Sequence, residues 1–356
     1  MKILVTGCGG FIGSHLLDRL LAREGVSIIG WDPDCKRISH LLDHPALSFR
    51  QERLGGPESL ARLEQDVADC DWVFNLSAIC HPSRYNTEAL RTIHVNLFEA
   101  YPVIELAARL GRKLVHFSTS EVYGKTIASY LGGYDDVDPA LYMMNAENSP
   151  LIMGPVRNQR WSYACAKQML ERLVYAHHHE SGLQFAIIRP FNFFGPRMDY
   201  LPGIESEGVP RVLPMFISAV LRGIPIQLVD GGHARRTITS VHDAIDALMA
   251  ILDQPQRSLN HIYNIGNPRN EVSMRELAEA VRQTFVRVSG ETRFARHPIE
   301  IVSSMDFYGP GYEDCDRRIM DISAERNQLG WSPSRELESL LDETVAYYWR
   351  LYGASS

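Results

Sequence analysis

Short apolar runs alternate with longer amphipathic segments over the first half of the chain. The strand-like runs fall at residues 3–6, 26–31, 47–50, 72–76, 113–117 and 185–190. Segments with apolar residues recurring on one helical face lie between them, at 14–23, 58–67, 88–110 and 162–179. Strands that alternate with helices predict an α/β fold, in which a parallel sheet is covered by helices on both faces.

The first strand runs directly into a glycine-rich turn and then a helix. Gly7 allows the tight turn, Gly10 lets a ligand's pyrophosphate approach the backbone, and Gly13 lets the helix pack closely against the strand. With Phe11 and Ile12, these residues form the start of the helix, whose free N–H groups attract phosphate. The pattern predicts a Rossmann-like, doubly wound dinucleotide-binding domain.

The second strand ends in an acidic residue, Asp32, about 20 residues beyond the glycine turn. A carboxylate at this position accepts a hydrogen bond from a ribose hydroxyl and repels a 2′-phosphate, so the sequence predicts NAD as the cofactor. Lys36 and Arg37 follow closely and could pair with a 2′-phosphate. NADP is therefore the alternative.

The regular alternation of strands and helices ends near residue 190. Beyond this point, prolines and glycines between 196 and 210 interrupt the pattern. We predict an NAD-binding domain over 1–190 and a smaller lobe that binds substrate over 191–356, with a segment near 230–266 returning to the first domain. Residues 125–158 predict a long irregular excursion, which is typical of functional loops.

Composition and charge exclude several classes of function. The net charge of −7 and the absence of basic runs argue against nucleic-acid binding. No apolar stretch approaches the roughly 20 residues that cross a membrane, and there is no signal-like N-terminus. The six cysteines form no close pairs, which is typical of reduced thiols in the cytoplasm. We interpret His177–His179 as a solvated helix end and predict no metal site.

Tyr163 and Lys167 stand four residues apart on a predicted helix, so their side chains share one face. A phenol with a pKa near 10 is a weak base at neutral pH, but a nearby ammonium and a nicotinamide cation favour its phenolate form. Tyr163 is then a candidate base for removing a proton from a sugar hydroxyl while a hydride leaves the same carbon. The strand-end segment Ser118–Ser120 precedes this pair by about 40 residues, which strengthens the catalytic interpretation.

Several longer motifs extend this picture and carry a family resemblance. The chain resembles the extended short-chain dehydrogenases that act on nucleotide sugars, above all UDP-apiose/UDP-xylose synthases and the UDP-glucuronate decarboxylase domain of the bifunctional polymyxin-resistance enzyme. The likeness spans nearly the whole chain. It rests on the motifs at 78–80, 85–87, 116–126, 159–167, 189–192, 208–212, 228–232 and 311–314.

The resemblance implies a decarboxylating reaction. Glu121 stands where 4-epimerases carry a small residue, and Ser120 stands where 4,6-dehydratases carry the acid that protonates a departing hydroxyl. Glu121 is therefore expected to face C6 of UDP-glucuronate, with Arg318 completing the site. Oxidation at C4 makes a β-keto acid that loses carbon dioxide, and Thr119 or Ser120 would stabilise the enolate.

The resemblance also implies a set of substrate contacts and an oligomeric state. Arginines suit diphosphate oxygens, and the implied contacts to a UDP-sugar are Arg160, Asn192, Arg211, Arg236 and Tyr312. A homodimer is expected through paired helices that start near Glu88 and Ser162.

Some positions depart from the relatives' pattern. Cys80 is retained, whereas Ser120 replaces the second cysteine of plant apiose synthases. Gln227, Leu54 and Phe193–Phe194 are further departures. The pentose product is left open between UDP-apiose and UDP-xylose. The alternatives are an enzyme that releases UDP-4-keto-pentose and NADH, a UDP-sugar 4-epimerase, and a non-catalytic NAD sensor, against which the intact Tyr163, Lys167 and Glu121 argue.

Overall fold

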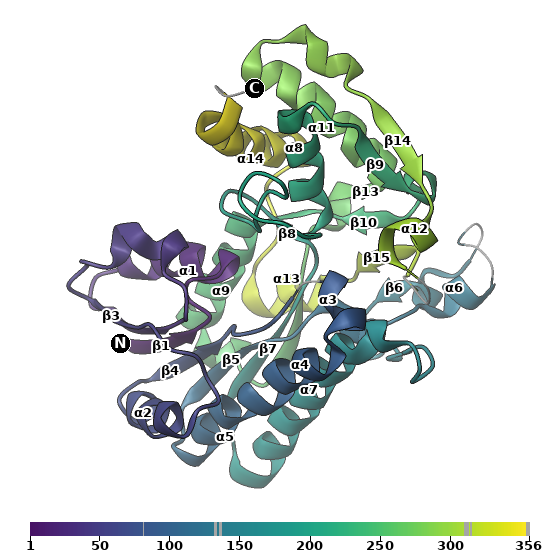
Figure 1. The fold of residues 1–356 in the computed structure, drawn as a ribbon. Coiled ribbons are helices and arrows are strands. Elements are labelled where there is room, and N and C mark those ends of the chain that lie inside the picture. The colour runs from purple at the N-terminus through teal and green to yellow at the C-terminus, as the bar shows by residue number, and fades with distance from the viewer. Residues whose placement is uncertain (81, 132–133, 135–136, 310–312, 314, 354–356) are drawn as a thin grey trace.

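The protein is built on a seven-stranded, fully parallel sheet (Figure 1). The computed structural model describes residues 1–80, 82–131, 134, 137–309, 313 and 315–353. The sheet has the order β12-β7-β5-β4-β1-β2-β3, which confirms the predicted α/β Rossmann-like fold. Its strands are β1 (Lys2–Thr6), β2 (Ser27–Trp31), β3 (Leu47–Arg50), β4 (Trp72–Asn75), β5 (Lys113–Phe117), β7 (Phe185–Pro190) and β12 (His261–Ile265).

Helices cover both faces of this sheet because successive strand residues point to opposite sides. Ile3 and Val5 pack toward α1 (Phe11–Leu21) and α9 (Val241–Asp253), whereas Leu4 packs toward α2 (Pro57–Ala68), α5 (Tyr101–Arg109) and α7 (Ser162–Ser181). The central strands β1, β4, β5 and β7 are buried on both sides, and this explains their continuous apolar runs. β12 pairs with β7, as the return of the 230–266 segment requires, while the exact domain division stays a prediction.

The predicted helix over 88–110 is interrupted. It consists of α4 (Ala89–Ile93), a π-helical turn η2 (His94–Glu99) and α5. Asn96 in the turn is bonded to both backbone groups of Ile79, accepting from N–H at 3.0 Å and donating to the carbonyl at 3.1 Å. Pro102 lies in the first turn of α5, where its missing N–H is tolerated. The helix is therefore divided at η2. The spacing of apolar residues does not reveal this division.

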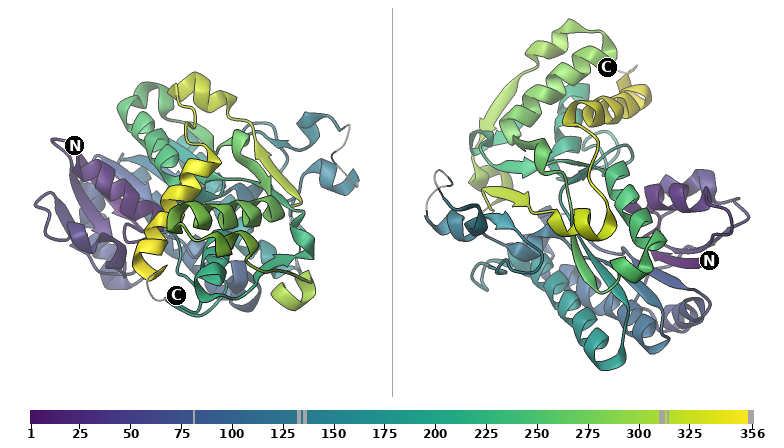
Figure 2. Two further views of the ribbon diagram at one scale, coloured as in Figure 1. Left: turned by 90° about the horizontal axis from the view of Figure 1, so that it is seen from above. Right: turned by 180° about the vertical axis from the view of Figure 1, so that it is seen from behind.

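A second lobe stands above the carboxyl ends of the strands (Figure 1). It contains the sheet β13-β10-β15-β6 and the parallel pair β14-β9. Its last long helix, yellow in the view from above in Figure 2, packs against α11. The strands are β6 (Met143–Met144), β9 (Ile226–Val229), β10 (Arg235–Thr237), β13 (Glu271–Ser273), β14 (Ile299–Val302) and β15 (Arg317–Met320), and the long helices are α8 (Val212–Arg222), α11 (Met274–Ser289) and α14 (Leu337–Tyr352).

The chain also contains many short elements, one of which links the two lobes. β6 belongs to the predicted excursion of 125–158 and pairs with β15, so the excursion adds a strand to the second lobe. The remaining elements are α3 (Pro82–Thr87), η1 (Lys36–Leu41), η3 (Ser120–Tyr123), α6 (Ile127–Leu131), η4 (Pro139–Leu141), η5 (Gln159–Trp161), β8 (Phe193–Phe194), η6 (Asp230–Gly232), β11 (Thr239–Ser240), α10 (Pro255–Ser258), η7 (Pro268–Asn270), η8 (Thr292–Arg296), α12 (Ser304–Tyr308) and α13 (Ser323–Leu329).

Candidate active site

The glycine turn after β1 has the tight geometry that a pyrophosphate site requires. Gly7 has φ of +73°, and its N–H donates to the carbonyl of Trp31 at 2.8 Å. A Cβ added at Gly13 would lie 2.7 Å from Cys8 Cα, inside contact distance, so α1 packs closely on the turn as expected. A Cβ at Gly10 would meet only the Gly7 carbonyl oxygen, at 3.2 Å. Gly10 therefore faces open space at the start of α1.

The carboxylate of Asp32 is fixed at the end of β2 by two backbone donors. Gly9 N–H lies 3.0 Å from Oδ2, and Asp34 N–H lies 2.9 Å from Oδ1. Burial raises the pKa of Asp32, and these two donors partly offset that effect. Gly9 was not singled out from the sequence, although a Cβ there would lie 2.9 Å from Asp32 Cγ. Arg37, part of the NADP alternative, donates to the Arg197 carbonyl at 2.8 Å.

Tyr163 and Lys167 lie in the first turns of α7, and both are buried. Lys167 Nζ donates to the Phe117 carbonyl at the end of β5, at 2.9 Å, and burial lowers the pKa of Lys167 to about 8. The Tyr163 hydroxyl lies 3.4 Å from Cys80 Sγ, and its ring stacks on Tyr85 with centroids 4.9 Å apart. Tyr85 belongs to the motif at 85–87, but the sequence predicts no role for it.

The protein alone does not stabilise the phenolate of Tyr163. Burial, and then Cys80 and Tyr85, raise the pKa of this phenol well above its ordinary value. The sequence predicts that Lys167 and the nicotinamide cation together favour the phenolate. In the structure burial has the larger effect, so Tyr163 is held as a neutral phenol by its own surroundings.

Glu121 is held between two buried arginines. Thr119 Oγ1 accepts the Glu121 N–H at 3.1 Å and begins η3, in which Ser120 is buried. Arg160 donates to both carboxylate oxygens of Glu121, at 2.5 and 3.1 Å, and Arg318 donates to Oε1 at 3.3 Å. Each arginine is 4% exposed. Arg160, a predicted diphosphate contact, thus pairs with Glu121.

Strand register separates the arginines of the site from those outside it. Arg236 on β10 and Arg318 on β15 are direct partners in parallel strands, so they share one face of the second sheet. Arg236 donates to the carbonyls of Arg235 and Asp316, at 2.7 and 3.3 Å. Arg317 lies on the other face and forms a bidentate pair with Glu271, at 2.6 and 2.9 Å.

Arg211 joins the second lobe to the glycine turn. It stands at the N-cap position of α8, and its guanidinium lies 5.4 Å from the Phe11 ring centroid at the start of α1. Asp199 accepts its Nε and Nη2 at 2.9 and 2.8 Å. This partner, twelve residues earlier in the chain, was not predicted from the sequence.

Two further predicted substrate residues lie near this junction. Asn192 has φ of +43° and donates from Nδ2 to the Thr237 carbonyl at 3.0 Å. Tyr312 lies outside the described residues. Its neighbour Glu313 accepts the indole N–H of Trp161 at 3.2 Å, directly after Arg160 in sequence. Glu313 therefore contacts the residue next to Arg160, which in turn pairs with Glu121.

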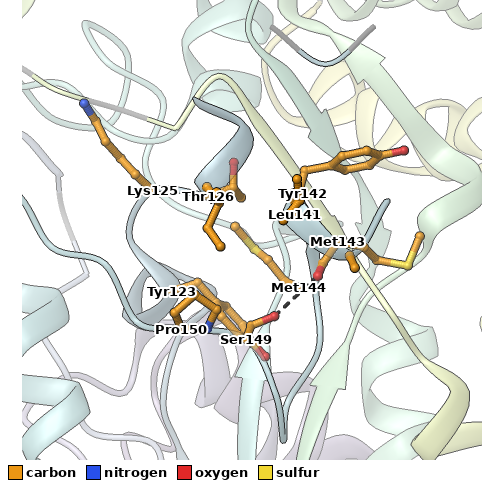
Figure 3. A pocket seen from close by; sticks show the side chains of 11 residues that line it. Tyr123, Lys125, Thr126, Leu141, Tyr142, Met143, Met144, Ser149 and Pro150 are labelled. Atoms are coloured by element: carbon orange, nitrogen blue, oxygen red, sulfur yellow. Dashed lines mark hydrogen bonds between the residues drawn. The ribbon is translucent and has the colours of Figure 1, made fainter. Parts of the chain in front are cut away.

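A separate shallow pocket is lined mostly by residues of the excursion (Figure 3). Tyr123, Lys125, Tyr142, Met144 and Ser149 are among its lining residues, and no predicted site residue lines it. Cys80 and Glu121 act electrostatically on Tyr163, and we place the candidate active site around these residues. Within the part of the chain that the structure describes, no cluster of three metal-ligating side chains occurs, and no helix is long and apolar enough to span a bilayer.

Comparisons of the sequence with known proteins find a matching family and similar curated enzymes. Residues 3–266 match the model of the NAD dependent epimerase/dehydratase family. The chain is 45% identical to UDP-D-apiose/UDP-D-xylose synthase 1 of Arabidopsis thaliana, over 99% of this chain and 92% of that protein. It is 44% identical to the UDP-D-apiose/UDP-D-xylose synthase of Oryza sativa subsp. japonica, over 99% and 90%.

Solved structures show the same fold. The PbgP3 protein of Burkholderia pseudomallei superimposes with a TM-score of 0.83 at 31% identity, covering 99% of this chain and 97% of that one. A UDP-glucuronic acid 4-epimerase of Bacillus cereus, solved with UDP-glucuronic acid and NAD, gives a TM-score of 0.78 at 23% identity, covering 99% and 100%. The latter likeness shows the fold alone.

Proposed function

The chain belongs to the NAD dependent epimerase/dehydratase family, and we propose that it decarboxylates UDP-glucuronate through a 4-keto intermediate to UDP-apiose, UDP-xylose or both. The observation that carries this proposal is the placement of Glu121 between Arg160 and Arg318, close to Tyr163. Two buried cations beside the base suit a substrate that carries an acid group at C6, as UDP-glucuronate does.

The residues around the glycine turn fit NAD. Gly10 leaves space for a pyrophosphate, the close packing at Gly13 aims α1 at it, and Asp32 is held ready for a ribose hydroxyl. When bound, NAD supplies the acceptor that takes the C4 hydride and later returns it. Lys167, anchored on the Phe117 carbonyl, would donate to the nicotinamide ribose.

Tyr163 is the proposed acid–base group at C4. Its raised pKa means that the phenol gives up its proton only when a positive charge lies near it. The Sγ atom of Cys80 lies 3.4 Å from the Tyr163 hydroxyl. The thiol would therefore lie near the sugar hydroxyls on which Tyr163 acts. We propose that Cys80 takes part in the route to UDP-apiose, in which the C2–C3 bond opens and closes again.

Loss of carbon dioxide follows from the chemistry of a β-keto acid. The C5–C6 bond breaks, its electron pair is delocalised onto the C4 oxygen, and a proton is then added at C5. Tyr163 and either Thr119 or Ser120 would donate to that oxygen. Arg318 is the proposed cation that holds the leaving carboxylate or protonates C5. Arg160 is proposed to act together with Arg318, because both arginines bind Glu121 in this structure.

The UDP group is proposed to lie between the lobes. Arg211 reaches from α8 to the start of α1, and Arg236 lies beside Arg318, so both are placed to meet the diphosphate or the sugar. Asn192 and Tyr312 are proposed substrate contacts on the resemblance alone. A homodimer is proposed through α4, η2 and α7, where Leu90, Phe98 and Met169 are 86%, 63% and 48% exposed. The six free thiols fit a cytoplasmic enzyme.

The decisive experiment supplies UDP-glucuronate, labelled with ¹⁴C at C6, to purified protein with NAD. Labelled carbon dioxide is expected, and NMR of the nucleotide products separates xylose, apiose and the 4-keto sugar. UDP-galacturonate without gas release would instead indicate a 4-epimerase. Accumulation of the 4-keto sugar with stoichiometric NADH would indicate the releasing dehydrogenase. Light scattering that shows a monomer would contradict the dimer.

A further inference from the structure

Helix α7 carries a third buried ionisable residue on the face of Tyr163 and Lys167. Glu171 follows Lys167 by four residues, so the three side chains form one stripe along the helix. They are 4%, 1% and 5% exposed, respectively. Glu171 lies about two turns beyond Tyr163 and is not needed by the chemistry proposed above.

Glu171 forms a bidentate ion pair with Arg189 on β7. Arg189 Nε donates to Oε1 at 2.9 Å and Nη2 donates to Oε2 at 2.7 Å. Arg189 is 3% exposed, so both charges are removed from water. Such buried pairs contribute little net stability because desolvation offsets their attraction. Their two parallel hydrogen bonds do, however, fix the position of one backbone against another.

The other side of Arg189 faces the segment that carries Glu121. Its guanidinium lies 4.7 Å from the ring centroid of Tyr123, the last residue of η3. The Tyr123 hydroxyl donates to Asn264 Oδ1 on β12 at 2.8 Å. Tyr123 is thus held between Arg189 and Asn264, two residues after Glu121.

We propose that Arg189 and Glu171 are positioning residues that set the separation of Tyr163 on α7 and Glu121 on η3. The first residue acts at C4 of the sugar and the second faces C6, so their spacing decides whether the 4-keto intermediate proceeds to loss of carbon dioxide and reduction. The pair acts through the helix and the 3₁₀ turn, since neither side chain reaches the sugar site. This inference rests on the proposed function.

The test compares Glu171→Gln with a matched control, Asp66→Asn. The glutamine side chain retains the shape of the glutamate but loses the charge that holds Arg189. Asp66 is also buried, accepting the Trp31 indole N–H at 2.8 Å and pairing with Arg50 at 3.2 Å, but it lies on α2 away from the site. Both variants are expected to lower Tm. Only Glu171→Gln is expected to slow pentose formation, by about 10- to 100-fold per folded molecule, because small misplacements of reacting groups have effects of this size.

Two readouts separate positioning from a general loss of stability. Glu171→Gln should raise the share of turnovers that end as released 4-keto sugar and NADH, with KM for UDP-glucuronate changed by less than about 3-fold, whereas Asp66→Asn leaves this share unchanged. Hydrogen exchange of the protein without ligands should rise in residues 119–124 for Glu171→Gln alone. Arg189→Lys, which keeps the charge but loses the fork, should give the same shifts.

The proposal is overturned if the product ratio and the exchange of residues 119–124 match the wild type in Glu171→Gln. If that variant does not fold, the double variant Glu171→Met/Arg189→Met, which buries no charge, provides the same comparison. Failure of both to fold would show that the pair serves only the stability of the fold. Absence of labelled gas from the wild type would instead overturn the proposed function.

Discussion

Replacing single glycines of the turn after β1 should separate cofactor binding from folding. Gly10 has φ of −74° and ψ of 177°, which alanine adopts without strain, and its added Cβ would meet only the Gly7 carbonyl oxygen at 3.2 Å. Gly13 differs, because its added Cβ would lie 2.7 and 2.8 Å from backbone atoms of Cys8. We therefore expect Gly10→Ala to fold normally and lose NAD, and Gly13→Ala to be less stable even without ligand.

The magnitudes can be worked out for thermal unfolding. NAD at 100 times its Kd stabilises the native state by about 2.7 kcal/mol. Unfolding entropy of about 2.1 cal/mol/K per residue gives about 0.75 kcal/mol/K for 356 residues, so wild-type Tm should rise by about 4 °C. Overpacking at Gly13 costs about 1–3 kcal/mol, or about 1–4 °C without ligand.

The assay is differential scanning fluorimetry with and without NAD, supported by calorimetric titration. Gly10→Ala should melt within about 1 °C of the wild type when unliganded and show no rise with NAD. A full NAD-dependent rise in Gly10→Ala would refute the assignment of this turn as the pyrophosphate site. An unliganded Gly13→Ala protein as stable as the wild type would refute the packing argument.

Further substitutions test the catalytic groups and one buried acid. Tyr163→Phe should form no NADH with UDP-glucuronate while retaining NAD binding by calorimetry; rapid NADH formation would exclude Tyr163 as the base. Arg318→Lys should lower decarboxylation at least about 10-fold, measured as labelled gas, with 4-keto-hexuronate formation less affected; equal loss of both would contradict its place at C6. Burial raises the pKa of Glu325 to about 7, so the folded state retains a proton that the unfolded chain loses above about pH 4.3. Wild-type stability should therefore fall between about pH 4 and pH 7 relative to Glu325→Gln, with a difference of about 3–4 kcal/mol at about pH 8 in urea unfolding and almost none at about pH 4.

Local patterns predicted much of this protein. The run from β1 through the glycine turn to Asp32 lies within one βαβ unit, so its spacing determines its geometry, and the same holds for Tyr163 and Lys167 on one helix. The interruption at η2 was not predicted, because it depends on Asn96 bonding to Ile79 in a distant loop.

Contacts between distant segments were the hardest to predict. Glu121, Arg160 and Arg318 come from three separate parts of the chain, and motif likeness located the residues without revealing their mutual ion pairs. The pairing of Arg211 with Asp199 was missed for the same reason. The raised pKa of Tyr163 depends on how deeply α7 is buried, which spacing does not report.

The parallel register of β10 and β15 places Arg318 inside and Arg317 outside. Because side chains alternate along a strand, a shift by one position exchanges the two residues between faces. Both are arginines, so such a slip would leave Arg317 pointing inward, at the former position of Arg318 after an insertion and two positions earlier after a deletion. An insertion or deletion of one residue before β15 is therefore compatible with a folded protein, whereas the products of the reaction are expected to change.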